Sequence, residues 1–212
     1  MVSTQSSSSW FATCPRGVER LLVKELQQLG ASDTKEAIAG VSFKGSQSVA
    51  YRACLWSRLS NSIRLSLVES EANDRPSIYE SLSKIEWGKI FDVDTSFLVD
   101  FSGTNTHIRD TRFGAQVCKD AIVDWYKVNL GRVPPRDRVN AEIRIKVRLS
   151  KKGTNVALDL SGGSLHKRGY RSGSGESPLK ENLAAAVLLN ANWPEIAKDQ
   201  GALIDPMCGS AT

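Results

Sequence analysis

Histidine, cysteine and methionine are scarce in this chain, and their scarcity narrows the chemistry that it can carry. The 212 residues include two histidines, four cysteines and two methionines. The cysteines (Cys14, Cys54, Cys118 and Cys208) lie far apart and form no Cys-x-x-Cys pair, which argues against a zinc site or a disulfide framework. We therefore predict a chain that binds no metal and functions in a reducing compartment, the cytoplasm.

Long apolar runs and a secretory leader are also missing. No stretch approaches the ~18 uncharged apolar residues of a membrane-spanning helix, so no membrane partner is expected. The N-terminal MVSTQSSSS is polar and lacks the basic start and apolar stretch of a signal peptide, which predicts a disordered tail over residues 1–9. Hydrophobic residues make up 41% of the chain, enough for a real core in one large domain or two small ones.

Positive charge is concentrated in one segment. The whole chain has a formal net charge of +5, yet residues 136–171 alone hold ten Lys/Arg against three Asp/Glu, a local charge of +7. The remaining residues therefore sum to −2. A localised basic segment indicates a polyanionic partner such as nucleic acid.

Hydrophobic periodicity predicts an α+β fold in two successive parts. The first part reads as strand 10–14, helix 16–29, strand 41–45, helix 46–56 and strand 63–67. The second reads as helix 78–85, strand 96–101, helix 115–130 and a hairpin of strands 141–150 and 156–160. A third helix is expected to open at Pro178 and to end at Trp193–Pro194, followed by a strand at 202–204.

The first strand of the hairpin alternates strictly between apolar and basic residues. Ile143, Ile145, Val147 and Leu149 share one face, and Arg144, Lys146 and Arg148 share the other. Neighbours on one face are about 6.6 Å apart, which is close to the spacing of phosphates along a nucleic-acid strand. The basic face therefore fits either RNA contact or a solvated surface that discourages edge-to-edge aggregation.

The end of the sequence, GALIDPMCGSAT, places an acidic residue and small residues after a predicted strand. Open parallel sheets build nucleotide-like sites at this position, beyond the carboxyl end of a strand. The loop after Asp205 is neither Gly-x-Gly-x-x-Gly nor a phosphate-binding loop. Spacing alone leaves open both a cofactor site and an ordinary strand-to-helix turn.

Several motifs in series resemble the bacterial large-subunit (23S) rRNA guanine-N2 methyltransferases that carry an N-terminal THUMP domain. DPMCGSAT resembles their first S-adenosylmethionine motif, and SPLKENLAAAVLL resembles the motif that precedes it. FSGTNTHIRDTRFGAQVCKDAIVDW is similar to the THUMP core, and LDLSGGSLHKRGYR to the segment that follows it. FATCPRGVERLLVKEL and GVSFKG resemble the ferredoxin-like start.

The resemblance implies a domain order and identifies the chain as the N-terminal fragment of such an enzyme. We expect a ferredoxin-like part at 10–48, a THUMP RNA-binding domain at 49–160, a linker at 161–177 and the truncated start of a Rossmann-like α/β methyltransferase domain at 178–212. The full-length enzyme would use S-adenosylmethionine (SAM) to methylate the exocyclic amine of a guanine in large-subunit rRNA. The alternative is a non-enzymatic RNA-binding THUMP module with a degenerate methyltransferase remnant.

Carried onto this sequence, the resemblance implies a set of cofactor-binding residues and no catalytic residue. The cofactor set is Pro178, Lys180, Glu181, Asn182, Asp205, Pro206, Cys208, Gly209 and Ser210. The catalytic Asn/Asp-Pro-Pro-aromatic motif of the family is expected downstream of Thr212, because VPPR at 133–136 lacks both its polar and its aromatic residue. The fragment alone is expected to be inactive. Ala211 stands where the family usually has glycine, so a Cβ could crowd the loop.

The predicted RNA contacts follow from the basic segment and from the THUMP-like stretch. They are Arg109, Arg112, Lys119, Arg144, Lys146, Arg148, Lys167, Arg168, Tyr170 and Arg171. Tyr170 could stack on a base, although a tyrosine packed at a domain junction is an equally good reading. Phosphate contacts position RNA without naming its bases, so the pattern predicts no sequence specificity.

Overall fold

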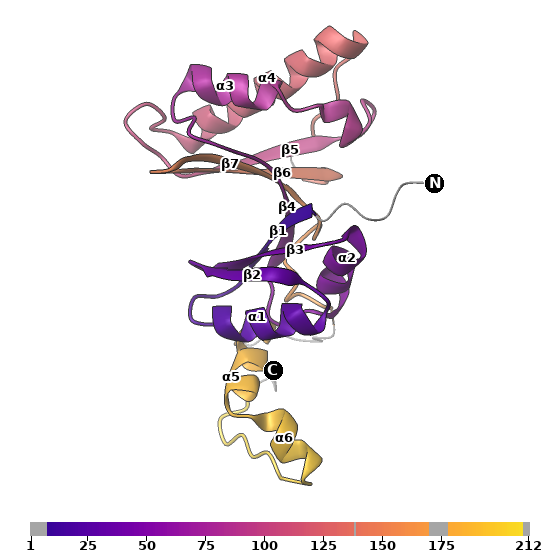
Figure 1. Cartoon of the computed structure of the whole chain (residues 1–212), viewed down its shortest axis with the longest axis vertical. Helices are drawn as coiled ribbons and strands as arrows, with labels where there is room; N and C mark the ends of the chain where they lie inside the picture. Colours follow the sequence, from indigo (N-terminus) through magenta and orange to yellow (C-terminus); the bar gives the residue numbers. More distant parts are fainter. Residues whose placement is uncertain (1–7, 138, 170–177, 210–212) are drawn as a thin grey trace. The chain divides into compact units, whose positions relative to one another are not determined.

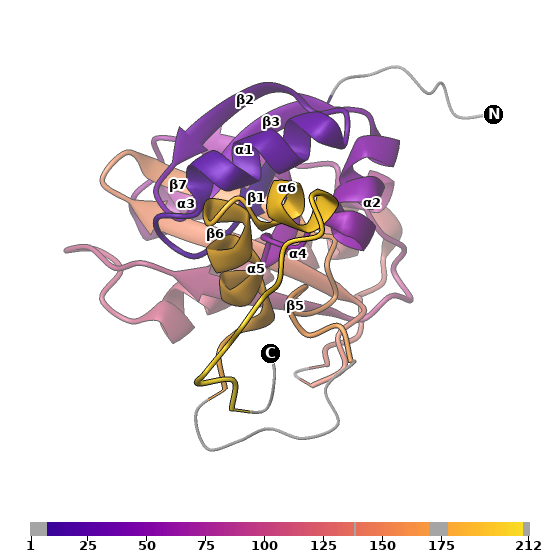
Figure 2. The same ribbon diagram turned by 90° about the horizontal axis from the view of Figure 1, so that it is seen from below.

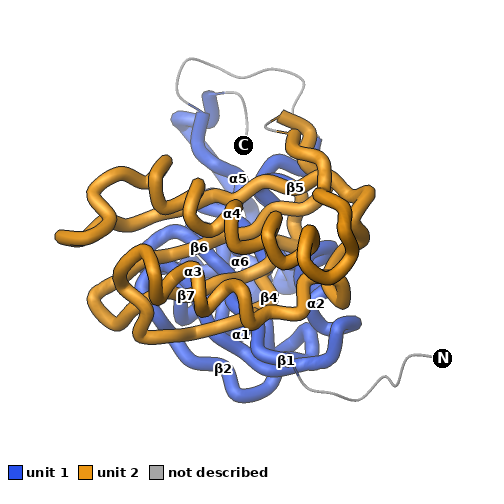
Figure 3. The backbone as a smooth tube through the Cα atoms, turned by 90° about the horizontal axis from the view of Figure 1, so that it is seen from above, with its two compact units in different colours: residues 1–63, 163–212 blue, residues 64–162 orange. Residues whose placement is uncertain are grey.

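The computed structural model describes residues 8–137, 139–169 and 178–209. It divides into two compact units (Figure 3). Unit 1 comprises residues 1–63 and 163–212, and unit 2 comprises residues 64–162. Unit 1 is thus assembled from both ends of the chain, with unit 2 inserted between them in sequence.

Unit 1 contains an antiparallel sheet with two helices packed against it (Figure 1). The strands are β1 (Ser8–Thr13), β2 (Ser32–Ala37) and β3 (Gly40–Gly45), in the order β2-β3-β1, and the first residues of β4 (Ser62–Ser70) follow β1. Helices α1 (Glu19–Gln28) and α2 (Gln47–Trp56) both contact β3. The strand and helix patterns predicted up to residue 67 are confirmed. Ser8 and Ser9, which we expected in the disordered tail, belong to β1, and the rest of that tail lies outside the described residues.

Strand β2 was missed because it has no apolar alternation. Its sequence, SDTKEA, is polar or small throughout, and five of its six residues are exposed. The strand exists because β3 supplies antiparallel partners at both of its ends, with Ala37 opposite Gly40 and Ser32 opposite Lys44, and with a register shift between Ser32 and Lys35. A short, charged edge strand of this kind also resists pairing with other chains.

The C-terminal segment of unit 1 forms two helices, α5 (Glu181–Asn190) and α6 (Trp193–Lys198), which Figure 2 shows from below. Trp193 and Pro194 do not end α5 as predicted. They open α6 instead, because proline is well tolerated in the first turn of a helix. The strand predicted at 202–204 is wrong: these residues form no strand, and Leu203 and Ile204 are exposed. No described strand pairs with them, and a strand needs a partner for its backbone groups.

Unit 2 is a four-stranded sheet with two helices on one face (Figure 1). The strand order is β4-β7-β6-β5, where β5 is Phe97–Ser102, β6 is Ile143–Ser150 and β7 is Gly153–Asp159. Strand β7 is antiparallel to β4 and β6, whereas β5 runs parallel to β6. Helices α3 (Arg75–Ser83) and α4 (Thr111–Leu130) are linked by a short 3-10 turn, η1 (Trp87–Lys89), and by β5.

The core of unit 2 forms between these helices and the apolar face of the sheet. Ile145, Val147 and Leu149 of β6 are buried, which confirms the alternation predicted for this strand. Tyr126 on α4 is fully buried, and its hydroxyl donates to the Trp87 carbonyl oxygen at 3.1 Å. Burial of this phenol raises the pKa of Tyr126 to about 12.

Helix α4 begins earlier than its apolar pattern predicted, at Thr111 rather than at residue 115. The Asp110 carboxylate accepts a hydrogen bond from the Arg112 backbone N–H at 2.8 Å and so caps the first turn. This bond, with the Arg112 guanidinium, holds the pKa of Asp110 below its usual value. The earlier start places Arg112 within the first turn of α4 and sets up the site described next.

Candidate RNA interface and cofactor segment

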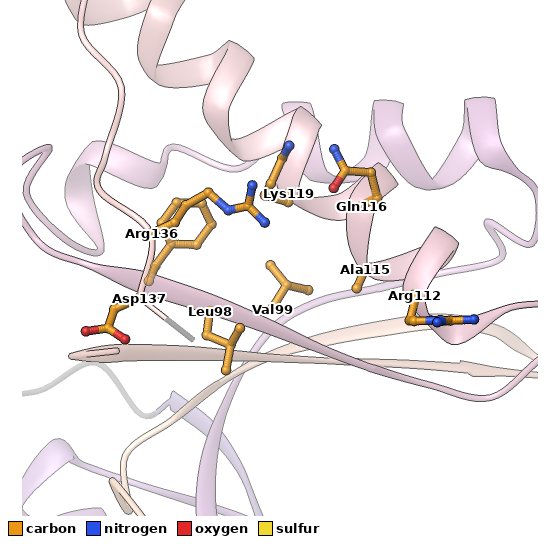
Figure 4. A pocket seen from close by; sticks show the side chains of 9 residues that line it. Leu98, Val99, Arg112, Ala115, Gln116, Lys119, Arg136 and Asp137 are labelled. Atoms are coloured by element: carbon orange, nitrogen blue, oxygen red, sulfur yellow. The ribbon is translucent and has the colours of Figure 1, made fainter. Parts of the chain in front are cut away.

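A pocket of about 370 Å³ lies in unit 2, between the first half of α4 and the edge strand β5 (Figure 4). Its lining combines an apolar floor with three cations and one carboxylate. The lining residues are Phe97, Leu98, Val99, Arg112, Ala115, Gln116, Lys119, Arg136 and Asp137. In Figure 4 the Arg136 guanidinium extends into the space above Val99, and the Lys119 side chain lies beside it on α4.

The three cations of the pocket differ in the ion pairs and hydrogen bonds that they already form with protein groups. Lys119 forms an ion pair with its neighbour Asp120, and its side chain is only 16% exposed. Arg112 pairs with Asp110 at 3.2 Å but remains 91% exposed, so water screens that pair. Within the described part of the chain, the guanidinium of Arg136 makes no hydrogen bond or ion pair. Arg136 is therefore the cation most available to an anionic ligand.

Two of these cations belong to the predicted RNA set and one does not. Arg112 and Lys119, both predicted RNA contacts, lie seven residues apart on α4, which is about two helical turns, and both line this pocket. The sequence places Arg136 in the basic segment but gives no sign that it reaches this pocket. An isolated bridge pairs Arg136 with Phe97 and holds it beside β5. The two residues are 39 apart in sequence, so no local pattern reveals this contact.

The basic face of β6 is largely neutralised by carboxylates of neighbouring strands. Lys146 Nζ lies 2.6 Å from Asp100 Oδ2 and 3.8 Å from Asp159 Oδ2. Arg144 approaches the same Asp100 carboxylate at 3.9 Å. Arg148 is exposed and lies directly opposite Asn155 of β7. Of the three predicted contacts on this strand, Arg148 is the one that the structure leaves most open to a ligand.

The remaining predicted RNA residues are spread over both units. Arg109 is exposed, and its Nε donates to the Thr106 carbonyl oxygen at 3.3 Å. Lys167 is exposed, whereas Arg168 donates to the carbonyl oxygens of Cys54 at 2.9 Å and Ser57 at 2.8 Å. Arg168 thereby caps the carboxyl end of α2. Tyr170 and Arg171 lie outside the described residues.

Among the predicted cofactor residues, those on α5 face protein groups. Glu181 Oε2 lies 2.8 Å from His166 Nδ1, and Asn182 Nδ2 donates to Asn61 Oδ1 at 2.9 Å. Asn182 is fully buried, and its Oδ1 has no partner in the described structure. Pro178 and Lys180 are exposed just before the helix, and Lys180 is its N-terminal cap residue.

The loop after residue 204 forms an open turn. Asp205 Oδ1 accepts a hydrogen bond from the Met207 backbone N–H at 3.0 Å. Pro206, Cys208 and Gly209 are exposed, and Gly209 has a φ of +53° with free space around its Cα. Ser210 lies outside the described residues, as does Ala211. The turn could admit a ligand to its backbone, but Glu181 and Asn182 are occupied by protein partners, so the described residues form only part of a cofactor site.

No helix in the described ranges is long and apolar enough to cross a membrane. Within the same ranges, no cluster of three or more His, Cys, Asp or Glu side chains could hold a metal ion.

Family models match three successive segments of the chain. The RlmL ferredoxin-like domain matches residues 9–63, the THUMP domain matches 72–159, and the RMKL-like methyltransferase domain matches 168–212. The predicted boundary between residues 48 and 49 lies inside α2, whereas unit 1 and the ferredoxin-like match both extend to residue 63.

Curated relatives match almost the whole of this chain. The ribosomal RNA large subunit methyltransferase K/L of Cellvibrio japonicus is 51% identical over 96% of this chain, and that of Methylococcus capsulatus is 50% identical over 96%. The chain spans 27% and 28% of the lengths of these two relatives.

Solved structures show the same fold. A Listeria monocytogenes protein described as a predicted N6-adenine-specific DNA methylase superposes with a TM-score of 0.78 at 28% identity, over 87% of this chain and 48% of that one. A proposed methyltransferase complexed with SAH superposes with a TM-score of 0.77 at 28% identity, over 89% and 50%.

Fold, domain order and relatives together define a class: this is a THUMP-domain protein with a ferredoxin-like start and the beginning of a methyltransferase domain. Within that class, the chain matches the RlmL/RlmKL-type family, and the curated relatives that it matches are named ribosomal RNA large subunit methyltransferase K/L.

Proposed function

We propose that the chain is the RNA-docking part of a SAM-dependent methyltransferase that modifies the exocyclic amine of a guanine in large-subunit rRNA. The observation that carries this proposal is the succession of ferredoxin-like, THUMP and methyltransferase matches along the chain, together with the match to a relative 51% identical in sequence. The substrate would be rRNA or its assembly precursor in the bacterial cytoplasm.

The chain's own contribution would be to bind and orient RNA. Arg112, Lys119 and Arg136 would neutralise phosphates at the α4–β5 pocket, with Arg136 as the uncommitted cation. Arg148 of unit 2 and Lys167 of unit 1 are further exposed positive charges. Fixing the RNA in place makes methyl transfer effectively unimolecular, which is a large part of what a positioning domain can contribute.

SAM would supply the electrophilic methyl group when bound. Asp205, Pro206, Cys208 and Gly209 would form one edge of its site, since their turn leaves backbone groups exposed. The described residues hold only part of that site, and we assign no catalytic residue among them.

RNA binding can be tested on the 212-residue chain by fluorescence anisotropy over a series of salt concentrations. Arg136→Ala should weaken binding to a large-subunit rRNA fragment by about 3- to 10-fold and should reduce the slope of log K against log[salt] by roughly 0.7–0.9, the value for one lost phosphate contact. Lys198→Ala, which removes an exposed lysine from α6, is the matched control and should change neither. Equal effects of the two substitutions would contradict a role for the pocket.

Methyl transfer can be tested on the full-length protein with SAM and large-subunit rRNA, followed by nucleoside mass spectrometry. N2-methylguanosine is the expected product. N6-methyladenosine would instead favour the activity named for the Listeria structure. RNA binding without any methylated product, from a correctly folded full-length protein, would support the non-enzymatic THUMP module.

A further inference from the structure

A buried junction in unit 1 joins α5 to the loop at residues 57–61. The backbone N–H of Leu165 donates to the Asn61 carbonyl oxygen at 2.9 Å, which brings the segment that precedes α5 onto this loop. Three residues further on, the Arg168 guanidinium is held by the end of α2. The chain entering α5 is thus attached to the ferredoxin-like part at two points before the helix begins.

His166 and Glu181 form the next contact of the junction. His166 Nδ1 lies 2.8 Å from Glu181 Oε2, and the two side chains are only 12% and 13% exposed. The Nδ1–H can donate to the carboxylate in the neutral tautomer as well as in the imidazolium. A hydrogen bond to a charged acceptor in this sheltered position is stronger than a pair on the surface.

Asn182 makes the deepest contact. It is fully buried, and its Nδ2 donates to Asn61 Oδ1 at 2.9 Å and to the Leu59 carbonyl oxygen at 3.3 Å. The side chain therefore points from the first turn of α5 into the loop at residues 57–61. A buried amide held in this way specifies one register of the helix, because any shift would leave its donors unpaired.

The loop that receives these contacts is itself firmly held. The buried carboxylate of Glu25 on α1 accepts hydrogen bonds from the Ser57 hydroxyl at 2.6 Å and from the Arg58 backbone N–H at 3.0 Å. The junction therefore connects α1, the loop and α5 through consecutive buried polar contacts. A loop fixed on one side by α1 can fix α5 on the other.

We propose that His166, Glu181 and Asn182, which we name the α5 anchor, set the position of the methyltransferase domain on the ferredoxin-like part. Glu181 and Asn182 then act as positioning residues, although the family resemblance places both in the cofactor pocket. The consequence for methyl transfer rests on the proposed function. The structural part of the inference does not, and each part has its own test.

The structural part is tested by hydrogen exchange of the α5 backbone amides in the 212-residue chain, read by mass spectrometry. His166→Ala and Glu181→Ala should each accelerate exchange across α5 by about 10-fold or more, since both remove the same contact. Glu181→Gln keeps an oxygen that accepts from Nδ1–H and should retain most of the protection. Glu195→Ala, which removes a carboxylate that is 57% exposed on α6, should leave α5 unchanged.

The two alanine substitutions also form a double-mutant cycle. If His166 and Glu181 act through each other, the double variant should exchange about as fast as either single variant. Multiplicative effects, or α5 protection unchanged by His166→Ala, would overturn the anchor. Far-ultraviolet circular dichroism and the thermal melt of each variant establish that unit 1 is folded. If Glu181→Ala does not fold, the comparison of His166→Ala with Glu181→Gln still decides the test.

The functional part is tested on the full-length protein by measuring SAM affinity, KM for rRNA and kcat. An anchor predicts that His166→Ala and Glu181→Ala lower kcat by about 10-fold while the Kd for SAM and the KM for rRNA change less than 2-fold, because misplacement affects the reacting geometry. A Kd for SAM that rises 10-fold for Glu181→Ala but not for His166→Ala would assign Glu181 to the cofactor instead. If the unmodified protein transfers no methyl group, the proposed function fails while the exchange experiment still decides the anchor.

Discussion

Replacing Glu25 with alanine is expected to destabilise unit 1 more than any change to an exposed charge would. Glu25 is a buried carboxylate on α1 whose two oxygens serve a loop more than thirty residues away in sequence. The Ser57 hydroxyl and the Arg58 and Leu59 backbone N–H groups all donate to it, at 2.6, 3.0 and 3.4 Å. Alanine would leave these donors without their acceptor.

The size of the effect follows from those contacts. A hydrogen bond to a charged group contributes about 1.5–3 kcal/mol, and a donor left buried without a partner costs about 1–3 kcal/mol. The Leu59 contact is long, and the Arg58 guanidinium is 61% exposed, so neither adds much. We therefore expect Glu25→Ala to lower the free energy of unfolding of unit 1 by about 3–4 kcal/mol, and Glu25→Gln by roughly half as much, since the amide keeps one acceptor oxygen.

Urea unfolding followed by tryptophan fluorescence measures the change, because Trp10 is buried in unit 1. Glu36→Ala is the control: Glu36 is half exposed on β2 and approaches Arg20 only at 3.9 Å, so its loss should change the free energy by less than about 0.5 kcal/mol. A loss below about 1 kcal/mol for Glu25→Ala, with the fold unchanged, would refute the view that this carboxylate organises the loop.

Three further results are expected. Gly103→Ala should destabilise unit 2 by at least about 2 kcal/mol in urea unfolding, because φ is +90° and the new Cβ would lie 2.0 Å from the Leu149 carbonyl oxygen; an unchanged midpoint would contradict this. Iodoacetamide should alkylate exposed Cys208 within minutes, while buried Cys14 and Cys118 should react only after unfolding, as peptide mass spectrometry would reveal. Burial raises the pKa of both buried thiols to about 12. Between pH 9 and 12 the folded state therefore keeps protons that the unfolded state releases. The free energy of unfolding should fall over this range by up to about 1.4 kcal/mol per pH unit for each thiol. A stability that stays flat over this range would contradict that account.

Elements whose faces are set by burial were predictable from the sequence. The alternation at 143–149 identified β6 and its buried face, and the spacing of Leu22 and Leu26 identified α1, because burial imposes a period of its own on each element. Strand β2 carried no such period, since both of its faces are solvated and only its pairing with β3 defines it. The segment at 202–204 had the apolar residues of a strand but no described neighbour to pair with.

The site residues were less predictable, because their roles depend on partners far away in the sequence. Glu181 and Asn182 resemble motif residues of a cofactor pocket, but the structure pairs them with His166 and Asn61. Arg168 lies in the basic crossover, yet its guanidinium caps α2. Motif spacing gives the type of a side chain and its position on an element, whereas its partner is decided by the tertiary fold.

The basic strand β6 is an example, and it changes which residue we expect to contribute most to RNA binding. Alternation correctly placed Arg144 and Lys146 on one face, but it contained no information about Asp100, which parallel pairing with β5 brings beside Lys146 from 46 residues away. An ion pair in place before RNA arrives must be broken or shared when a phosphate approaches, which reduces the gain from binding there. Among the described residues the guanidinium of Arg136 has no ion-pair partner, so a phosphate that binds it breaks no existing pair. Substituting Arg136 should therefore weaken RNA binding more than substituting Lys146, although Lys146 is the more conspicuous residue in the sequence.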